Sequence, residues 1–159
     1  MIAVCFVCHG NICRSPTAEA VFATLVERAG LQHAIAIESA GCSDEHAGES
    51  PDRRSARVAV ARGYSMRSCA RRFERDDFAR FDLVIAMDRH NRAHLERLAP
   101  SASARAKLKM LREYDDEDPR PIDVPDPWYG GGEGFDEVLA ICERACTGLL
   151  AEIRRTHAL

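Results

Sequence analysis

The sequence predicts an α/β fold, in which a single domain holds a four-stranded parallel sheet with helices on both faces. Short apolar runs of strand length alternate with longer segments whose apolar residues recur at helical spacing. The apolar runs are continuous, as is typical of parallel strands that are buried on both faces. The length of 159 residues is that of one domain with a sizeable core.

The first predicted strand covers residues 2–7, and a helix follows it. Ser15 is a good candidate for the helix N-cap, Pro16 fits the first helical position, and Gly30 fits the residue just past the helix end. The helical spacing is carried by a set of apolar residues, namely Ala18, Val21, Phe22, Leu25, Val26 and Ala29.

The rest of the chain continues this alternation. Strands are predicted at residues 34–38, 81–87 and 106–111, and helices at 55–62, 91–98 and 135–156. The inward face of the last helix should be formed by Val138, Leu139, Ile141, Cys142, Ala145, Leu149 and Ile153. Ligands of such parallel sheets bind at the carboxyl ends of the strands.

The segment between the first strand and the first helix carries the most chemical information. It reads Cys8-His9-Gly10-Asn11-Ile12-Cys13-Arg14, with Ser15-Pro16 directly after it. Inward-pointing N–H groups, the helix N-terminus and the Arg14 guanidinium would favour a thiolate on Cys8 and would also hold the oxygens of a phosphate. The Ser15 hydroxyl could add a hydrogen bond to the sulfur. Gly10 allows a close approach of the backbone to an anion, and Asn11 tolerates a left-handed backbone and could brace the loop. The sequence therefore predicts a phosphate-binding loop after the first strand.

Other interpretations of these cysteines are weaker. Most free cysteines are buried structural thiols. The stretch Cys5-Phe6-Val7-Cys8-His9 matches the C-x-x-C-H pattern of haem attachment, but Cys5 falls inside the apolar strand and no secretory segment is expected. A zinc site at Cys5, Cys8 and Cys13 lacks a second ligand pair, and His90 with His94 lacks a third ligand. We therefore expect no metal and no other cofactor.

Attack on a phosphate ester also needs a general acid for the leaving oxygen. The segment Val124-Pro125-Asp126-Pro127-Trp128-Tyr129-Gly130 offers Asp126, stiffened by a proline on each side. Trp128 and Tyr129 would form the walls of a slot for an aromatic ring. Asp123 and the acidic run 115–118 are weaker candidates, which we expect to be solvated.

Composition limits the class of protein. The chain is 46% hydrophobic and 30% charged, which is typical of a folded globular protein. The formal charge of −3 gives no support for a nucleic-acid or membrane surface, and no apolar stretch is long enough to span a bilayer. Seven cysteines without the spacing of a disulfide framework favour a reducing compartment, so we expect a cytoplasmic protein.

The Cys8–Arg14 string with Ser15-Pro16, together with Asp126-Pro127-Trp128-Tyr129, resembles the low-molecular-weight protein tyrosine phosphatases. The resemblance runs along the whole chain, so residues 1–159 would form one phosphatase domain. Further matching positions are Ser39-Ala40-Gly41, Asp52 with Arg53-Arg54, Asp77-Phe78, Asp88 and Asn91.

This resemblance implies a role for each matched residue. Cys8 would be the nucleophile, Arg14 would clamp the phosphate, and Asp126 would act as general acid and then activate water. The phosphate-binding residues would be His9, Gly10, Asn11, Ile12, Cys13, Arg14 and Ser15. The supporting residues would be Ser39, Asp88 and Asn91, and the substrate cleft would be lined by His9, Glu45, Trp128 and Tyr129. Cys13 would form a reversible disulfide with Cys8.

Three positions depart from the family pattern. His9 stands where Leu is common, Glu45 falls in a loop that often carries an aromatic residue, and Ser68 replaces a histidine of eukaryotic members. The first two should alter the cleft wall. His9 would add positive charge at mildly acidic pH.

Three functions are consistent with this pattern. The first is hydrolysis of phosphotyrosine proteins and aryl phosphates through a phosphocysteine on Cys8, by a monomer or weak dimer. The second is thiol-dependent arsenate reduction, which needs two further relay cysteines; Cys69 stands alone, and Cys142 and Cys146 fall in the last predicted helix. The third is an inactive phosphate-binding module, which would need neither Cys8 nor Asp126.

Overall fold

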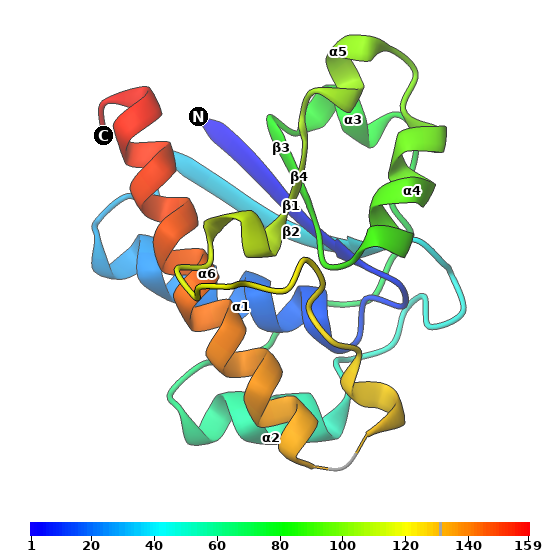
Figure 1. The fold of residues 1–159 in the computed structure, drawn as a ribbon, viewed down its shortest axis with the longest axis vertical. Helices are drawn as coiled ribbons and strands as arrows, with labels where there is room; N and C mark the ends of the chain where they lie inside the picture. Colours follow the sequence, from blue (N-terminus) through cyan, green and yellow to red (C-terminus); the bar gives the residue numbers. More distant parts are fainter. Residues whose placement is uncertain (131) are drawn as a thin grey trace.

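The computed structural model describes residues 1–130 and 132–159, except for the side chain of Tyr129. The described residues form one four-stranded sheet in which every neighbouring pair is parallel, in the order β2-β1-β3-β4 (Figure 1). The strands are β1 (Ile2–Cys8), β2 (Ile35–Gly41), β3 (Leu83–Ala86) and β4 (Leu108–Met110). The predicted fold class is confirmed.

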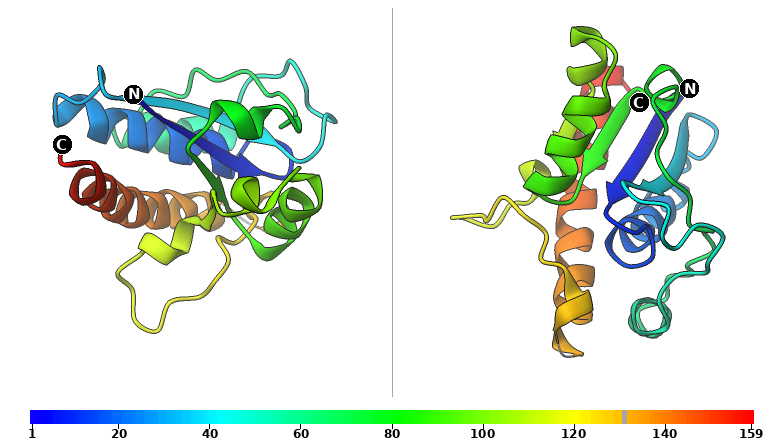
Figure 2. Two further views of the ribbon diagram at one scale, coloured as in Figure 1. Left: turned by 90° about the horizontal axis from the view of Figure 1, so that it is seen from above. Right: turned by 90° about the vertical axis from the view of Figure 1, so that its right-hand side faces the viewer.

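Helices cover both faces of the sheet, as the views along two further directions show (Figure 2). On one side α1 (Arg14–Arg28) and α6 (Glu133–His157) pack against each other, and α2 (Arg53–Ala61) packs against both. The other side carries α3 (Asp77–Arg80), α4 (Arg89–Leu98) and α5 (Ala102–Arg105). Two short 3-10 helices, η1 (Leu111–Tyr114) and η2 (Pro127–Tyr129), lie in the segment between β4 and α6.

The central strand β1 is buried on both faces, which explains its continuous apolar sequence. Because side chains alternate along a strand, Val4, Phe6 and Cys8 join the core beneath α1 and α6, whereas Cys5 and Val7 join the core beneath α3 to α5. The last residue of β1 is therefore a cysteine that faces α1, at the carboxyl edge of the sheet.

The start of α1 differs from the prediction. Cys13, not Ser15, occupies the N-cap position and makes no side-chain capping bond, and Arg14 is the first helical residue. The Ser15 hydroxyl is turned toward the preceding loop, where it contacts Cys8 and Asn11. Tertiary contacts have overridden the usual capping preference. Gly30 follows the C-cap with a φ of 70°, as predicted.

Strand and helix boundaries otherwise differ from the predictions by a few residues at most, and the seven inward residues of α6 are buried. Two short helices were not predicted, because the four residues of α3 and of α5 are too few to show a helical period.

The expectation that the acidic run 115–118 is solvated is wrong for its first member. Asp115 is buried and accepts hydrogen bonds from Arg144, and it also pairs with Arg112. Burial opposes ionisation of Asp115, but the Arg144 hydrogen bond and nearby charges outweigh it and lower the pKa of that carboxyl. Residues 116–120 are exposed, and their loop projects from the body of the molecule (Figure 2).

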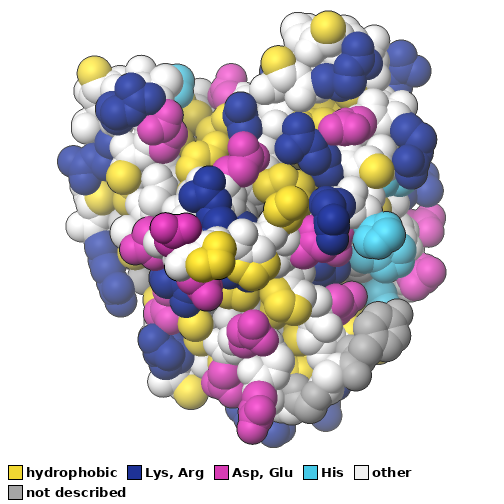
Figure 3. Space-filling view, viewed as in Figure 1, with side chains coloured by type: hydrophobic (Ala, Val, Ile, Leu, Met, Phe, Trp, Pro, Cys, Tyr) yellow, Lys and Arg dark blue, Asp and Glu magenta, His cyan; other side chains and the backbone are white. Residues whose placement is uncertain are grey.

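The surface mixes both signs of charge. On the face shown in Figure 3, Lys and Arg side chains are interspersed with Asp and Glu, and no single-sign field covers that face. Among the residues that the structure describes, no helix has the length and apolar character needed to cross a membrane.

Candidate active site

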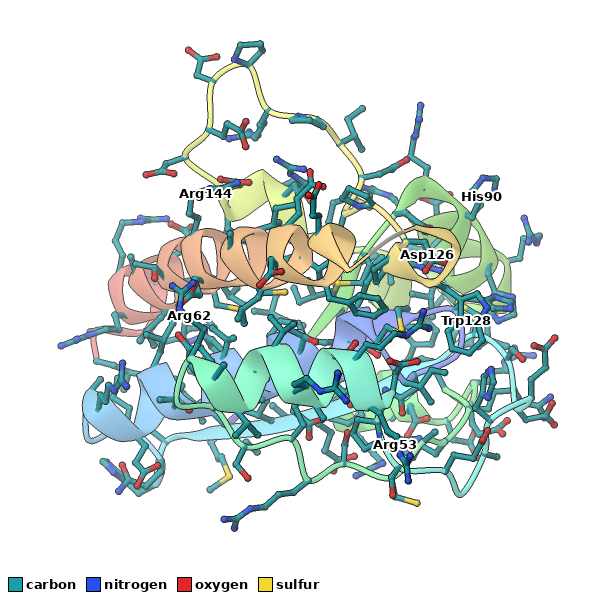
Figure 4. The ribbon with its side chains drawn as sticks, turned by 90° about the horizontal axis from the view of Figure 1, so that it is seen from below. Arg53, Arg62, His90, Asp126, Trp128 and Arg144 are labelled. Atoms are coloured by element: carbon teal, nitrogen blue, oxygen red, sulfur yellow. The ribbon has the colours of Figure 1, made fainter. Side chains whose placement is uncertain are left out.

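A cleft lies at the carboxyl end of β1, where the loop of residues 8–14 leads into α1. It encloses about 400 Å³. Its walls come from three separate stretches of the chain and are formed by Cys8, His9, Gly10, Ile12, Cys13, Arg14, Glu45, His46, Asp126 and Trp128. Figure 4 shows Asp126 and Trp128 near each other at this end of the molecule, whereas Arg62 and Arg144 lie farther back along α2 and α6.

The sulfur of Cys8 lies at the base of the cleft, and the residue is only 3% exposed. Its Sγ is 3.0 Å from the Oγ of Ser15, in the first turn of α1. The N-terminal turn of a long helix and a hydroxyl therefore both face this sulfur.

Asn11 holds the loop in shape. It has a left-handed backbone with a φ of 58°, and its buried amide donates to Ser15 Oγ at 2.8 Å and to Ser39 Oγ at 3.0 Å. Its Oδ1 accepts from the backbone N–H of Arg71 at 3.2 Å. Ser39 in turn donates to Glu19. One side chain thus connects the loop to β2 and to the segment after α2.

The end of β2 lies directly against the same loop. A Cβ added at Gly41 would stand 2.8 Å from the backbone oxygen of His9 and 3.2 Å from the backbone nitrogen of Asn11. Glycine is therefore required at position 41 for the loop to pass so close to the strand.

Arg14 lies between two carboxylates. It is 3% exposed, and its Nη1 donates to Asp88 Oδ2 at 2.6 Å and to the backbone oxygen of Val124 at 3.1 Å. Its Nη2 is 3.6 Å from Asp126 Oδ2. Burial alone would lower the pKa of this guanidinium, but Cys8 and the hydrogen bond to Asp88 raise it. The side chain is thus a fixed cation beside the Cys8 sulfur.

Asp126 comes from a distant part of the chain. It is the N-cap of η2 and accepts from the Trp128 backbone N–H at 3.0 Å. Its side chain is 36% exposed, so water and ligands can reach the carboxyl group at the mouth of the cleft. Trp128 is 42% exposed and forms part of the wall beside it.

The three residues predicted to support the site lie behind the cleft. Ser39 contacts Asn11, Asp88 contacts Arg14, and Asn91 forms a reciprocal capping box with Asp88 at the start of α4. Of the predicted cleft residues, His9, Glu45 and Trp128 line the cleft, and the side chain of Tyr129 is outside the described part of the structure.

The prediction omitted His46 and Arg54. The ring of His46 lies 5.8 Å from that of Trp128, so an aromatic side chain does stand in the loop after β2, one residue beyond Glu45. The Arg54 guanidinium lies 5.2 Å from the centre of the Trp128 ring. Arg54 belongs to the matching stretch Asp52-Arg53-Arg54, but no local pattern places it or His46 at the site, because their segments meet the Asp126 loop only in the folded chain.

Among the described residues, no group of three or more His, Cys, Asp or Glu side chains could hold a metal ion.

Comparisons with known proteins agree with this geometry. A family model described as low molecular weight phosphotyrosine protein phosphatase matches residues 3–159. A low molecular weight protein-tyrosine-phosphatase of Streptomyces coelicolor is 49% identical over 152 residues, which cover 95% of this chain and 93% of that protein.

Solved structures give the same result. A protein tyrosine phosphatase from Entamoeba histolytica, crystallised with Hepes in its active site, aligns over 99% of each chain with a TM-score of 0.94 and 34% identity. A Drosophila arginine phosphatase aligns over 95% of this chain and 97% of its own, with a TM-score of 0.88 and 30% identity. The chain therefore belongs to the low molecular weight phosphotyrosine protein phosphatase family, whose members are cysteine-dependent phosphoric monoester hydrolases.

Proposed function

We propose that this protein hydrolyses phosphotyrosine in protein substrates, and simple aryl phosphates, through a phosphocysteine intermediate on Cys8. One observation carries the proposal. The Cys8 sulfur, the buried Arg14 guanidinium and the half-exposed Asp126 carboxyl group meet in one cleft, although Asp126 is more than a hundred positions away in the chain.

The first step transfers the phosphoryl group to the enzyme. The Cys8 thiolate attacks phosphorus and forms an S–P bond, while the bond from phosphorus to the tyrosine oxygen breaks. Asp126, protonated at this stage, gives its proton to the leaving phenol oxygen. Arg14 and the N–H groups of residues 9–14 hold the equatorial oxygens, where negative charge develops.

The second step restores the enzyme. The Asp126 carboxylate takes a proton from a water molecule as the water oxygen attacks phosphorus, and the S–P bond breaks. Inorganic phosphate leaves, Cys8 returns as a thiolate that accepts a hydrogen bond from Ser15, and Asp126 is protonated again. Asp88 and Asn91 act behind the cleft by fixing the position of Arg14.

The cleft walls support an aromatic substrate. Trp128 offers a ring face at the mouth, next to Asp126, and the tyrosine ring of a substrate can stack there while its phosphate reaches Cys8. We propose that His9, Glu45 and Tyr129 complete this wall.

The decisive experiment is turnover by two variants. Cys8→Ser should abolish hydrolysis of phosphotyrosine peptides, and Asp126→Asn should slow it by about a hundredfold or more while phosphate still binds. Full activity of Cys8→Ser would refute the proposal. If the wild-type protein instead bound phosphate and hydrolysed none of these substrates, an inactive phosphate-binding module would be the remaining function.

The substrate class needs a parallel assay, because one similar structure is an arginine phosphatase. Peptides carrying phosphotyrosine, phosphoserine or phosphoarginine should be compared at equal concentration. The proposal expects the phosphotyrosine peptide to give the highest kcat/KM, and a preference for phosphoarginine would contradict it.

Arsenate reduction is the alternative chemistry for such a loop. It needs two further cysteines that can reach Cys8, and Cys142 and Cys146 are fully buried in α6. Burial raises the pKa of Cys142 to about 12, so its thiol is a poor nucleophile near neutral pH. We therefore favour the phosphatase. Thiol-dependent arsenate reduction, measured beside aryl phosphate hydrolysis, distinguishes the two.

We also propose that Cys13 protects Cys8 by forming a reversible disulfide with it under oxidising conditions. Both residues border the same cleft, and both are free in the structure. We further propose that the enzyme works in the cytoplasm as a monomer or weak dimer. Sedimentation velocity at several protein concentrations would test the oligomeric state through the sedimentation coefficient.

A further inference from the structure

The loop that carries Asp126 has a second point of attachment, away from Arg14. The Arg54 guanidinium lies near two aromatic rings, 5.2 Å from the centre of the Trp128 ring and 4.6 Å from that of Phe135. Trp128 belongs to η2, directly after Asp126, and Phe135 belongs to the first turns of α6. A planar cation that contacts aromatic rings in this way is attracted by their π-electrons.

Arg54 is itself held in place by Asp52. Its Nε donates to Asp52 Oδ1 at 3.2 Å and its Nη2 to Asp52 Oδ2 at 3.1 Å. This two-point contact fixes the orientation of the guanidinium plane. It also lowers the pKa of Asp52, although burial acts in the opposite direction. The side chain of Arg54 is 44% exposed, so it owes its position to these partners and not to enclosure in the core.

Asp52 in turn is bound to the phosphate-binding loop. Its backbone N–H donates to the backbone oxygen of Ile12 at 2.8 Å, and its side chain caps α2. Phe135, the second ring beside Arg54, packs against Ile12 and Cys13 of the same loop. A continuous set of contacts therefore runs from the phosphate-binding loop through Asp52 and Arg54 to Trp128.

The last contact reaches the general acid. The Trp128 backbone N–H donates to Asp126 Oδ1 at 3.0 Å, so the position of Trp128 sets that of the carboxyl group. The only other polar contact of the Asp126 side chain among the described residues is its 3.6 Å approach to Arg14, which is long for a hydrogen bond. Asp126 thus depends strongly on the placement of its own loop.

We infer that Arg54 is a positioning residue that holds Trp128, and through it Asp126, in register with the phosphate-binding loop. The inference rests on the proposed function, in which Asp126 is the general acid. Arg54 does not line the cleft, and it acts on the reaction only through the loop that it holds.

The first test uses fluorescence and does not depend on activity. Trp128 is the single tryptophan of the chain, so all tryptophan emission reports on the surroundings of this side chain. Arg54→Gln should raise the acrylamide quenching constant of Trp128 by about twofold, because an exposed cation–π contact shifts a population by roughly that factor. Quenching identical to that of the wild type would overturn the inference.

The second test separates general-acid catalysis from binding. A phenol with a high pKa needs a proton as it leaves, whereas nitrophenolate needs little help. Arg54→Gln should therefore lower kcat/KM for phenyl phosphate by about tenfold and that for p-nitrophenyl phosphate by less than about twofold. In the Asp126→Asn background, Arg54→Gln should cause no further loss. Equal losses on both substrates, or an additive loss in the double variant, would contradict the inference.

Two neighbouring substitutions complete the design. Arg53→Gln removes the same charge one residue away, from an exposed side chain that points away from Asp126 and Trp128 (Figure 4), and should leave both readouts unchanged. Arg54→Lys keeps the charge without the planar group. Its quenching constant and its kcat/KM for phenyl phosphate should fall between those of the wild type and Arg54→Gln.

The outcomes also distinguish this inference from the proposed function. If Asp126→Asn alone left phenyl phosphate turnover unchanged, the general-acid assignment would fail and the catalytic part of the inference with it. Suppose instead that Asp126→Asn has a strong effect, but that Arg54→Gln has the same quenching constant and the same dependence of kcat/KM on the leaving group as the wild type. This result would contradict the inference and leave the proposed function intact.

Discussion

The hydroxyl of Ser15 lies 3.0 Å from the sulfur of Cys8, which stands seven positions earlier in the chain. The contact exists because the loop turns back on itself at Asn11, whose left-handed backbone brings the first turn of α1 under the end of β1. A residue that looks like a helix cap is therefore a partner of the proposed nucleophile.

Replacing Ser15 should slow the reaction without unfolding the protein. Ser15→Ala removes the hydroxyl that faces the Cys8 sulfur, and the loss of a hydrogen bond to a charged group should lower the rate of alkylation by iodoacetate at fixed pH by about tenfold. Thr24→Ala, which removes a hydroxyl bonded only to the backbone of α1, is the matched control. Equal alkylation rates in the wild type and Ser15→Ala would show that the contact does not assist the thiolate.

Asp88 has two functions that two substitutions can separate. It pairs with Arg14, and it caps α4 by accepting from the Asn91 N–H at 2.8 Å. Asp88→Asn keeps a capping acceptor but removes the charge, so phosphate affinity should change while stability is nearly retained. Asp88→Ala should cost about 1 kcal/mol more in the free energy of unfolding, the usual effect of losing a cap. Calorimetric phosphate titration and urea unfolding measure the two effects. Equal stability of both variants would exclude the capping contribution.

Asp77 makes stability depend on acid pH. Burial opposes its ionisation, but hydrogen bonds from Arg71 and from the Glu74 N–H outweigh this and lower its pKa. A carboxyl with a lowered folded-state pKa stabilises the fold above its unfolded-state pKa near about 4, and this contribution is lost as the pH falls through the folded-state value.

Asp77→Asn should therefore destabilise the protein at neutral pH by roughly 1 to 2 kcal/mol, less than for a fully buried pair because its arginine partners are partly exposed. The difference from the wild type should shrink as the pH is lowered below about 4. Urea unfolding over this range is the measurement, and a difference that does not vary with pH would contradict the assignment.

Gly148 permits the closest contact between α6 and η1. A Cβ at this position would stand 2.1 Å from the backbone oxygen of Tyr114, so Gly148→Ala should destabilise the fold by about 3 kcal/mol. Gly134→Ala, in the same helix, meets only ordinary contacts at 3.5 Å and should be neutral or stabilising by up to about 1 kcal/mol. Thermal unfolding compares the two, and similar melting temperatures would refute the steric argument.

Cys13 should be protected from alkylation while Cys8 reacts. Burial raises the pKa of the Cys13 thiol to about 12, although a hydrogen bond with Ser55 acts against this. Below that pH the residue remains a weakly nucleophilic thiol. Mass spectrometry after brief iodoacetamide treatment at neutral pH should find label at Cys8 and none at Cys13, and equal labelling of both would contradict the expectation.

The fold could be predicted because each long element carries its own signal. The apolar run of β1 and the apolar face of α6 are local patterns that burial enforces, and both were placed to within about two residues. The phosphate-binding loop was also visible, since its cysteine, asparagine and arginine are close together in the chain. The helices α3 and α5 escaped prediction because a four-residue helix has no measurable period.

By itself, then, the sequence determined the parallel α/β architecture, the loop with Cys8 and Arg14, and the identity of Asp126 as an acid candidate, because hydrophobic period and motif spacing are local properties. Only the tertiary structure decided between the two roles open to Ser15, in favour of the Cys8 sulfur and against the helix cap. It also decided that Asp115 is buried with two arginines and that Arg54 lies against Trp128. These contacts join segments far apart in the chain, and their geometry follows from how the helices pack on the sheet.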